Sequence, residues 1–301
     1  MKRSKLWSIL LLVLLLSSGI LWGAVPASAG DPEKDSSSPY KKIEPPTLDQ
    51  LMHALPDTMP LENELNPLSP YYGKDPLPPG PRPPGMSVIL SPDQEFGTTI
   101  DYVSGSPSNP GAFGIHKIRP TMNTPEDPDE DTHIPLYAPT LMPPNQSALE
   151  ATLYYWRPYG QSTLRKFAVY DHSIPGWIYS TPFDSQTFQD TYTSSGWVNV
   201  TVQYVSNKWR VWLYNYDLEE WEQKAESSGS SNFSNGWDMW EAIHDDYVST
   251  YQSIEADDIR VWIDNDWEQV TDTYGGQWNT GMHPSWTKTW ISEYYHWKVE
   301  P

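Results

Sequence analysis

Short runs in which apolar and polar residues alternate are the feature that most limits what this chain can fold into. Residues 197–204 alternate as Trp-Val-Asn-Val-Thr-Val-Gln-Tyr, and residues 208–216 resume the alternation after a Ser-Asn turn. A period of two is typical of half-buried strands, and a two-residue turn between such runs predicts an antiparallel hairpin. Residues 165–170, 221–224 and 259–263 predict further strands. We therefore expect an all-β domain, an antiparallel β-sandwich or jelly roll, over residues 87–301.

A proline-rich segment, residues 30–86, precedes this domain. It ends in Pro-Leu-Pro-Pro-Gly-Pro-Arg-Pro-Pro-Gly at residues 76–85 and contains almost no aromatic residues. Proline cannot donate to a β-ladder, so the segment favours irregular or polyproline II structure, with one short helix expected near residues 47–54. Two interpretations stay open. The segment is a linker or spacer, or it is a propeptide that covers a groove until it is removed.

Residues 1–29 have the three parts of an export signal. Lys2, Arg3 and Lys5 form a basic start, residues 6–25 form an apolar run, and Ala-Ser-Ala at residues 27–29 is a small-residue cleavage site. The alternative is an uncleaved membrane anchor, but the break at Pro26 favours cleavage. We therefore expect a secreted, extracellular protein with no stable membrane insertion once the signal is removed.

The charge of the chain limits its partners. The formal net charge is −20, and removal of the signal would remove three basic residues and no acidic ones. A surface this negative repels nucleic acid, so no nucleic-acid partner is expected. The chain has no Cys, which excludes disulfides and thiolate nucleophiles, whereas 16 Trp and 19 Tyr can build a sizeable core. We expect a monomer.

Familiar catalytic motifs are absent from the sequence. It contains no His-Glu-x-x-His, Gly-x-Ser-x-Gly or P-loop pattern, and its seven His residues have no metal-ligand spacing. We therefore expect neither a metal nor a cofactor. An enzyme with this composition would depend on carboxylates that the fold brings together.

Two glutamates on strand-like segments are candidates for such chemistry. Glu150 would share one strand face with Thr152, Tyr154 and Trp156, which makes that face a plausible binding groove. Glu241 would share a face with apolar neighbours, where a charged residue must be paired, protonated or functional. The structural alternative is that each glutamate lies at a sheet rim and contacts water or an Arg.

Residues 148–171 resemble the first catalytic segment of the neprosin family, in which an Ile-Glu-Ala run is followed by a Pro, a Tyr-Gly turn and an Arg-Leu-Phe strand. Residues 193–241 resemble the later hairpin and second glutamate of that family. The resemblance implies a β-sandwich glutamic endopeptidase with a polypeptide substrate and a preference for proline-containing substrates. Glu150 and Glu241 would be the catalytic pair. The second segment lacks the Glu-Trp-Gly-Gly sequence of the family, and the cysteines of its plant members are missing.

The predicted mechanism needs one ionised and one protonated carboxyl. Two close carboxyls divide their titration, so one activates water while the other protonates the leaving amide. This predicts activity in acid and its loss above roughly pH 7. We predict Thr152, Tyr154, Trp156, Trp237 and Trp240 as substrate-binding residues.

The main alternative is a non-catalytic module that binds glycans or a cell surface. Trp156, Trp212, Tyr214 and Trp240 could form an aromatic platform, unless they belong to the core. A structural cell-surface protein, with the proline-rich segment as its stalk, is a third interpretation.

Overall fold

The computed structural model describes residues 38–81, 94–102, 104, 109–243, 251–280 and 285–301. Contacts divide the chain into residues 1–38 and 39–301, and only Ser38 of the first part is described. The predicted signal peptide and the boundary at residues 86 and 87 therefore lie outside the described residues.

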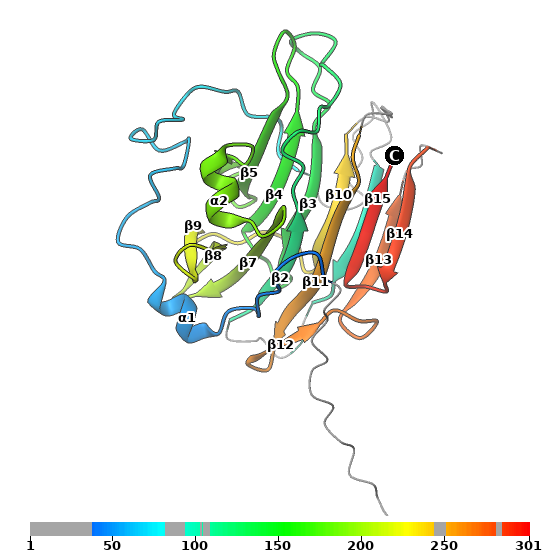
Figure 1. Ribbon diagram of the computed structural model, residues 1–301. Coiled ribbons are helices and arrows are strands. Elements are labelled where there is room, and N and C mark those ends of the chain that lie inside the picture. The colour runs from blue at the N-terminus through cyan, green and yellow to red at the C-terminus, as the bar shows by residue number, and fades with distance from the viewer. Residues whose placement is uncertain (1–37, 82–93, 103, 105–108, 244–250, 281–284) are drawn as a thin grey trace, which may run out of the picture. The chain divides into compact units, whose positions relative to one another are not determined.

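Two antiparallel sheets form a sandwich, which confirms the predicted fold class (Figure 1). In spatial order, sheet A contains β13 (Gly275–Thr280), β1 (Gln94–Ile100), β10 (Gly236–Ala242), β3 (Leu136–Met142), β4 (Leu149–Trp156), β5 (Leu164–Asp171) and β6 (Gly176–Pro182). Sheet B contains β14 (Thr287–Ser292), β15 (His296–Glu300), β11 (Ile254–Ile263), β2 (Gly111–Lys117), β7 (Trp197–Val205), β8 (Lys208–Asn215) and β9 (Glu220–Ser227), and β12 (Asp266–Gln269) pairs with β11.

The predicted strands are present with almost the predicted bounds, because the apolar residues of each alternating run form one face that packs into the core. β7 and β8 pair antiparallel around the turn at Ser206 and Asn207, both of which have positive φ. Val200, Val202, Val211 and Leu213 point from this hairpin into the core between the sheets. Each buried aliphatic side chain of this size contributes roughly 1.5–3 kcal/mol to the free energy of unfolding.

A buried polar contact crosses the core. His116 on β2 and Asp238 on β10 lie 2.7 Å apart between ring Nε2 and Oδ2, and Trp297 Nε1 donates to Asp238 Oδ1 at 2.9 Å. Both members of the ion pair are at most 1% exposed. This contact joins the two sheets, since β2 and β15 belong to sheet B and β10 to sheet A.

The predicted short helix is confirmed as α1 (Leu48–His53). Thr47 is its N-cap and forms a capping box with Gln50, each side chain accepting from the other residue's backbone N–H. A second helix, α2 (Gln186–Tyr192), was not expected from the sequence. Ser185 caps it, and Phe188 and Tyr192, four residues apart, face the core.

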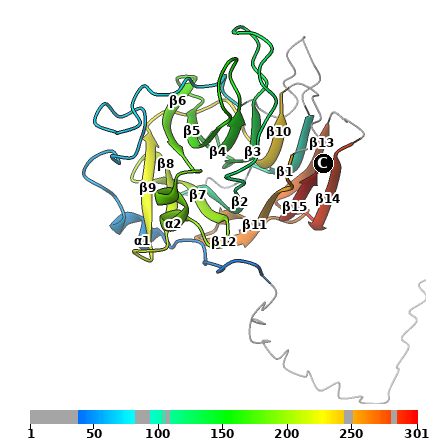
Figure 2. The ribbon, with the colours of Figure 1, turned by 45° about the horizontal axis from the view of Figure 1, so that its top comes forward.

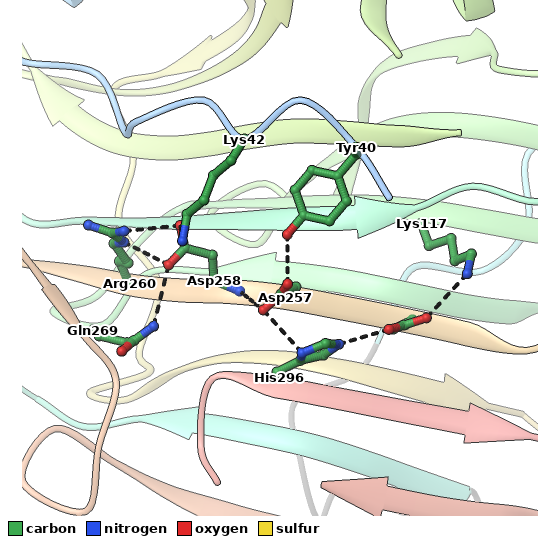
Figure 3. Close-up of polar contacts among 9 residues, drawn as sticks. Tyr40, Lys42, Lys117, Asp257, Asp258, Arg260, Gln269 and His296 are labelled. Atoms are coloured by element: carbon green, nitrogen blue, oxygen red, sulfur yellow. Dashed lines mark hydrogen bonds and ion pairs between the residues drawn. The ribbon is translucent and has the colours of Figure 1, made fainter. Parts of the chain in front are cut away.

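Residues 40–55 lie against the outer face of sheet B. Tyr40 and Leu51 pack on Trp197 and other aromatic residues of β2, β7, β8 and β9. Figure 3 shows the polar part of this attachment, in which Tyr40 donates to Asp257 at 2.6 Å and Lys42 lies 3.4 Å from Asp258. The aromatic residues below α1 are therefore covered by the chain itself.

Residues 60–81, here called the strap, continue from this segment to the other sheet. Figures 1 and 2 show the chain leaving α1 beside β9 and passing the β6 edge of sheet A. The strap has no regular secondary structure, as its proline content predicts. Backbone N–H of Glu64 donates to the Ser180 carbonyl on β6 at 2.7 Å. The strap therefore packs on the outer face of sheet A.

Candidate functional site

The outer face of sheet A carries most of the residues singled out from the sequence. On β4, Leu149, Ala151, Leu153 and Tyr155 point into the core. The alternate residues of this strand therefore lie on the opposite, outer face. They are Glu150, Thr152, Tyr154 and Trp156. This is the division of side chains that the sequence predicts for residues 149–156.

Glu150 is fully buried and both of its carboxylate oxygens accept hydrogen bonds. Its Oε2 lies 2.7 Å from His172 Nε2, and its Oε1 accepts from Trp237 Nε1 at 2.8 Å. Tyr170, Phe233 and Trp237 surround the imidazole of His172 with ring centroids 4.9–6.2 Å away. Glu150 is thus held by an imidazole and an indole, and does not lie at a sheet rim.

Glu241 is also buried, at 2% exposure, and its neighbour across the ladder is another glutamate. On β1 and β10, Glu95 and Glu241 are direct Cα partners. Glu95 is 3% exposed, and its Oε2 accepts from Trp278 Nε1 and, at 3.0 Å, from Thr280 Oγ1. Side chains directly opposite each other in an antiparallel pair have Cβ atoms about 5 Å apart, so these two glutamate side chains are neighbours on the outer face of sheet A.

A glycine lets β1 approach β10 beside this carboxyl pair. A Cβ atom at Gly97 would lie 2.4 Å from the backbone oxygen of Asp238 and 2.5 Å from Met239 Cα. These neighbours are backbone atoms, which cannot move without distorting the strand. Any larger residue at position 97 would therefore push the two strands apart. Gly97 thus fixes the spacing on which the Glu95–Glu241 pair depends.

The strand register separates Glu150 from Glu241. Trp237 pairs with Met142 on β3, and Leu141 pairs with Ala151, so Glu150 lies level with Trp237. Glu241 is four residues further along β10, about 13 Å at the usual strand rise, and β3 lies between the two strands. The carboxyls that we paired from the sequence are therefore too far apart to share one bridging water, and register supplies Glu95 as the partner of Glu241.

The predicted substrate-binding residues divide between the outer face and the core. Trp240 is fully buried in the core between the sheets, so it is not accessible for the substrate contact predicted from the sequence. Trp156 donates to Asp127 at 2.7 Å and is 2% exposed. Thr152, Tyr154 and Trp237 lie on the outer face and are also buried. Of these three, Trp237 contacts a candidate carboxylate.

The predicted aromatic platform does not form. Trp212 and Tyr214 belong to the cluster covered by residues 40–55 on sheet B, whereas Trp240 lies inside the sandwich. The four platform residues are at most 8% exposed. Core packing, the alternative weighed from the sequence, accounts for them.

Two tyrosines on the outer face of sheet A keep their protons. Burial, followed by the charge of Glu64, holds the pKa of Tyr154 well above its ordinary value. Burial, followed by the charges of Glu150 and Asp171, raises the pKa of Tyr170. Both hydroxyls are therefore available as donors and not as phenolates.

Glu95 and His172 are the residues that sequence reasoning missed. His172 follows β5, which forms a hairpin with β4 in which Glu150 pairs with Tyr170, so His172 lies diagonally across from Glu150. The register of this hairpin would therefore have identified His172 as a neighbour of Glu150. Glu95 begins an alternating run with Phe96 and Ile100 facing the core. Its proximity to Glu241 joins segments almost 150 residues apart, which no local pattern reveals.

Within the described parts of the chain, no group of three or more His, Asp or Glu side chains is placed to hold a metal ion. No helix among the same residues is both long and apolar enough to cross a bilayer.

Comparisons with known proteins give weak likenesses. No protein-family model matches the chain, and neither does any curated protein sequence. A crystal structure of scytalido-glutamic peptidase with a peptide-based transition-state analogue is 13% identical, covers 70% of this chain and 92% of that one, and has a TM-score of 0.31. The CBM2 module of the evolved Dit protein of Lactobacillus casei BL23 phage J-1 is 13% identical, covers 50% of this chain and 70% of that module, and has a TM-score of 0.25. At these TM-scores neither likeness establishes a shared activity.

Proposed function

We propose that this chain is a secreted, acid-active endopeptidase whose catalytic carboxyls are Glu95 and Glu241. The observation that supports it is the direct pairing of these buried glutamates across β1 and β10. The two side chains are cross-strand neighbours on the outer face of sheet A, so one can act as the base and the other as the acid on the same peptide bond. A site that holds one acid and one base at the same place is the chemical requirement for amide hydrolysis.

The roles of the two carboxyls follow from their partners. Glu95 Oε2 accepts from Trp278 and Thr280, which suits the ionised carboxylate. Glu95 would take a proton from a water molecule as that water attacks the scissile carbonyl carbon. Glu241 would give its proton to the amide nitrogen as the C–N bond breaks. After the products leave, the proton held by Glu95 passes to Glu241 and restores the starting state.

The oxyanion of the tetrahedral intermediate needs a donor, and Tyr137 is in place to supply one. Tyr137 lies directly opposite Glu241 on β3, and its hydroxyl donates to the backbone carbonyl of Pro79 in the strap. The hydroxyl can therefore reach a peptide carbonyl that lies on this face. The same donation to a developing oxyanion stabilises the transition state more than the ground state.

The position of the strap supports the proposal that the substrate is a polypeptide. It is already an extended chain segment on the outer face of sheet A, and it reaches the residue next to Glu241. We include in the proposal that residues 30–86 are a propeptide, so that the strap keeps the face covered until it is displaced or cut. A covered face is inaccessible to large substrates.

The test is proteolysis of a denatured proline-rich protein by the full chain across pH 3 to 8, with Glu241→Gln as the matched variant. We expect fragments of the substrate in acid, little cleavage above roughly pH 7, and none with the variant at any pH. Absence of cleavage at every pH, including after acid incubation has removed the strap, would refute the proposed function and leave the glycan-binding interpretation to be tested.

A further inference from the structure

The strap contacts sheet A with a three-residue period. Asp75 is half-buried, Pro78 and Pro81 are buried, and Pro76 and Pro79 between them are exposed. Three residues per turn is the period of the polyproline II helix, which prolines favour because their φ is fixed. We therefore infer that residues 75–81 of the strap adopt a polyproline II conformation, with Asp75, Pro78 and Pro81 directed at the sheet.

A cluster of aromatic side chains on sheet A packs against this face of the strap. The Trp177 ring lies 5.3–6.2 Å, between centroids, from the rings of Tyr137, Tyr154 and Tyr170. Trp177 Nε1 donates to the Pro78 carbonyl at 2.7 Å. Aromatic walls with an indole donor to a proline carbonyl form a general mode of polyproline recognition, because the backbone carbonyls of such a helix are not used internally.

A buried lysine, Lys166, forms an ion pair with Asp75 of the strap. Lys166 is 2% exposed, and its Nζ lies 2.9 Å from Asp75 Oδ2 and 2.5 Å from Glu64 Oε2. Glu64 is 4% exposed in its side chain, whereas Asp75 is 34% exposed. Both carboxylates belong to the strap, but Glu64 stays on Lys166 when only residues 75–81 are replaced, whereas Asp75 is removed with that segment.

The position after the two prolines is restricted to glycine. A Cβ atom at Gly80 would lie 2.2 Å from Cε2 and 2.3 Å from Cζ of Tyr170. Tyr170 is itself held between His172 and Trp177, so its ring has little room to move. A larger residue at this position would force the segment away from the cluster.

We propose that Lys166, Trp177 and Tyr170 form a recognition site for polypeptides of the form Asp-x-x-Pro-Pro-Gly in polyproline II conformation. Residues 75–80, Asp-Pro-Leu-Pro-Pro-Gly, are its internal occupant. The site binds by backbone carbonyls, one acidic side chain and one glycine, and it needs no hydrolysis. It therefore goes beyond the proposed peptidase, because a chain with no catalytic activity would still bind such segments.

The internal occupant has to be removed from the groove without shortening the chain. We would replace residues 75–81 by an equal number of Gly and Ser residues in a full-length Glu241→Gln background, which excludes cleavage. Binding of a fluorescent peptide with the sequence of residues 73–82 is then measured by anisotropy at pH 7. The chain with its own strap is the control, since a tethered occupant has a local concentration of about millimolar.

We expect the opened chain to bind the peptide at least tenfold more tightly than the control does. The peptide variants Asp75→Asn and Gly80→Ala should each bind roughly tenfold more weakly, and Trp177→Phe in the protein should weaken all peptides. Lys166→Met should abolish the difference in affinity between the parent peptide and its Asp75→Asn variant, and this cycle isolates the ion pair from general loss of affinity.

Equal binding of a scrambled peptide, or equal binding to the opened chain and the control, would overturn the proposal. So would an Asp75→Asn effect that survives in Lys166→Met. If Lys166→Met does not fold, Lys166→Gln gives the same comparison, because it also removes the charge and keeps a polar side chain of similar length. These outcomes concern binding alone, so they are distinguishable from failure of the proposed peptidase.

Discussion

Glu95 and Glu241 lie directly opposite each other on neighbouring antiparallel strands, and both side chains are almost completely buried. Opposed like charges in a β-ladder are unfavourable, and burial makes them more so. A fold that needed only stability would not place them there. The pair is therefore the feature of the outer face of sheet A that most clearly indicates a chemical role.

Removal of one charge from this pair should stabilise the fold. For Glu95→Gln we expect the free energy of unfolding at pH 7 to rise by roughly 1 kcal/mol, because the amide oxygen can still accept from Trp278 while the repulsion is lost. Urea denaturation measures this. Glu219→Gln, at an exposed surface pair, is the control and should change stability by less than about 0.5 kcal/mol. A loss of stability in Glu95→Gln would count against the repulsive pair.

Tyr137→Phe tests the assigned oxyanion donor. Loss of the hydroxyl should lower kcat roughly 100-fold with little change in KM, since the donor acts mainly on the transition state. Tyr154→Phe is the matched control, because Tyr154 pairs with Tyr137 across the sheet and contacts no strap carbonyl among the described hydrogen bonds. A kcat that falls equally in both variants would point to general disturbance of the tyrosine row.

The His116–Asp238 contact should be essential for stability. His116→Phe would leave buried Asp238 Oδ2 without its imidazole partner, so it should lower the free energy of unfolding by about 3 kcal/mol. His53→Phe is the control, since His53 is exposed at the end of α1 and should be nearly neutral. Similar unfolding midpoints for the two variants would contradict a structural role for the contact.

The contacts of Glu255 on β11 should stabilise the fold less in acid than at neutral pH. His296 and Lys117, both labelled in Figure 3, contact this carboxylate. Burial opposes the charge of Glu255, but the hydrogen bond from His296 and the charge of Lys117 outweigh it, so the pKa of Glu255 is below its ordinary value. A depressed carboxyl pKa stabilises the fold above the ordinary pKa and loses this effect as the pH falls through the folded-state pKa.

Glu255→Gln should therefore be less stable than the parent at pH 7, by about 1 kcal/mol, and the difference should shrink toward zero as the pH approaches 3. Thermal or urea unfolding measured at several pH values gives this dependence. A difference that stays constant from pH 7 to pH 3 would show that the ionisation of Glu255 does not contribute.

The fold was predictable because its signals are local. Alternation in residues 197–204 and 208–216 specified β7 and β8. The helix α2 was missed because its Phe188 and Tyr192 lie in a short segment flanked by strand-like runs, where two apolar positions do not establish a period.

The candidate site was predictable only in part. The face of Glu150 was assigned correctly, since it depends on strand alternation, and the burial of Glu241 followed the expectation for a charge beside apolar neighbours. The partner of each glutamate depended on which strands became neighbours. Glu241 meets Glu95, and Glu150 meets His172 and Trp237, through pairings that a single sequence does not encode locally.

The most direct test of the account compares three substitutions in one assay. Glu95→Gln, Glu241→Gln and Glu150→Gln variants, matched for folded fraction, would be assayed for kcat/KM on one peptide substrate at the acidic optimum. The account predicts that activity is lost in Glu95→Gln and Glu241→Gln and is largely retained in Glu150→Gln, whose side chain lies about 13 Å away along the strands. Loss in Glu150→Gln together with full activity in Glu95→Gln would contradict the Glu95–Glu241 pair and restore the pair expected from the sequence.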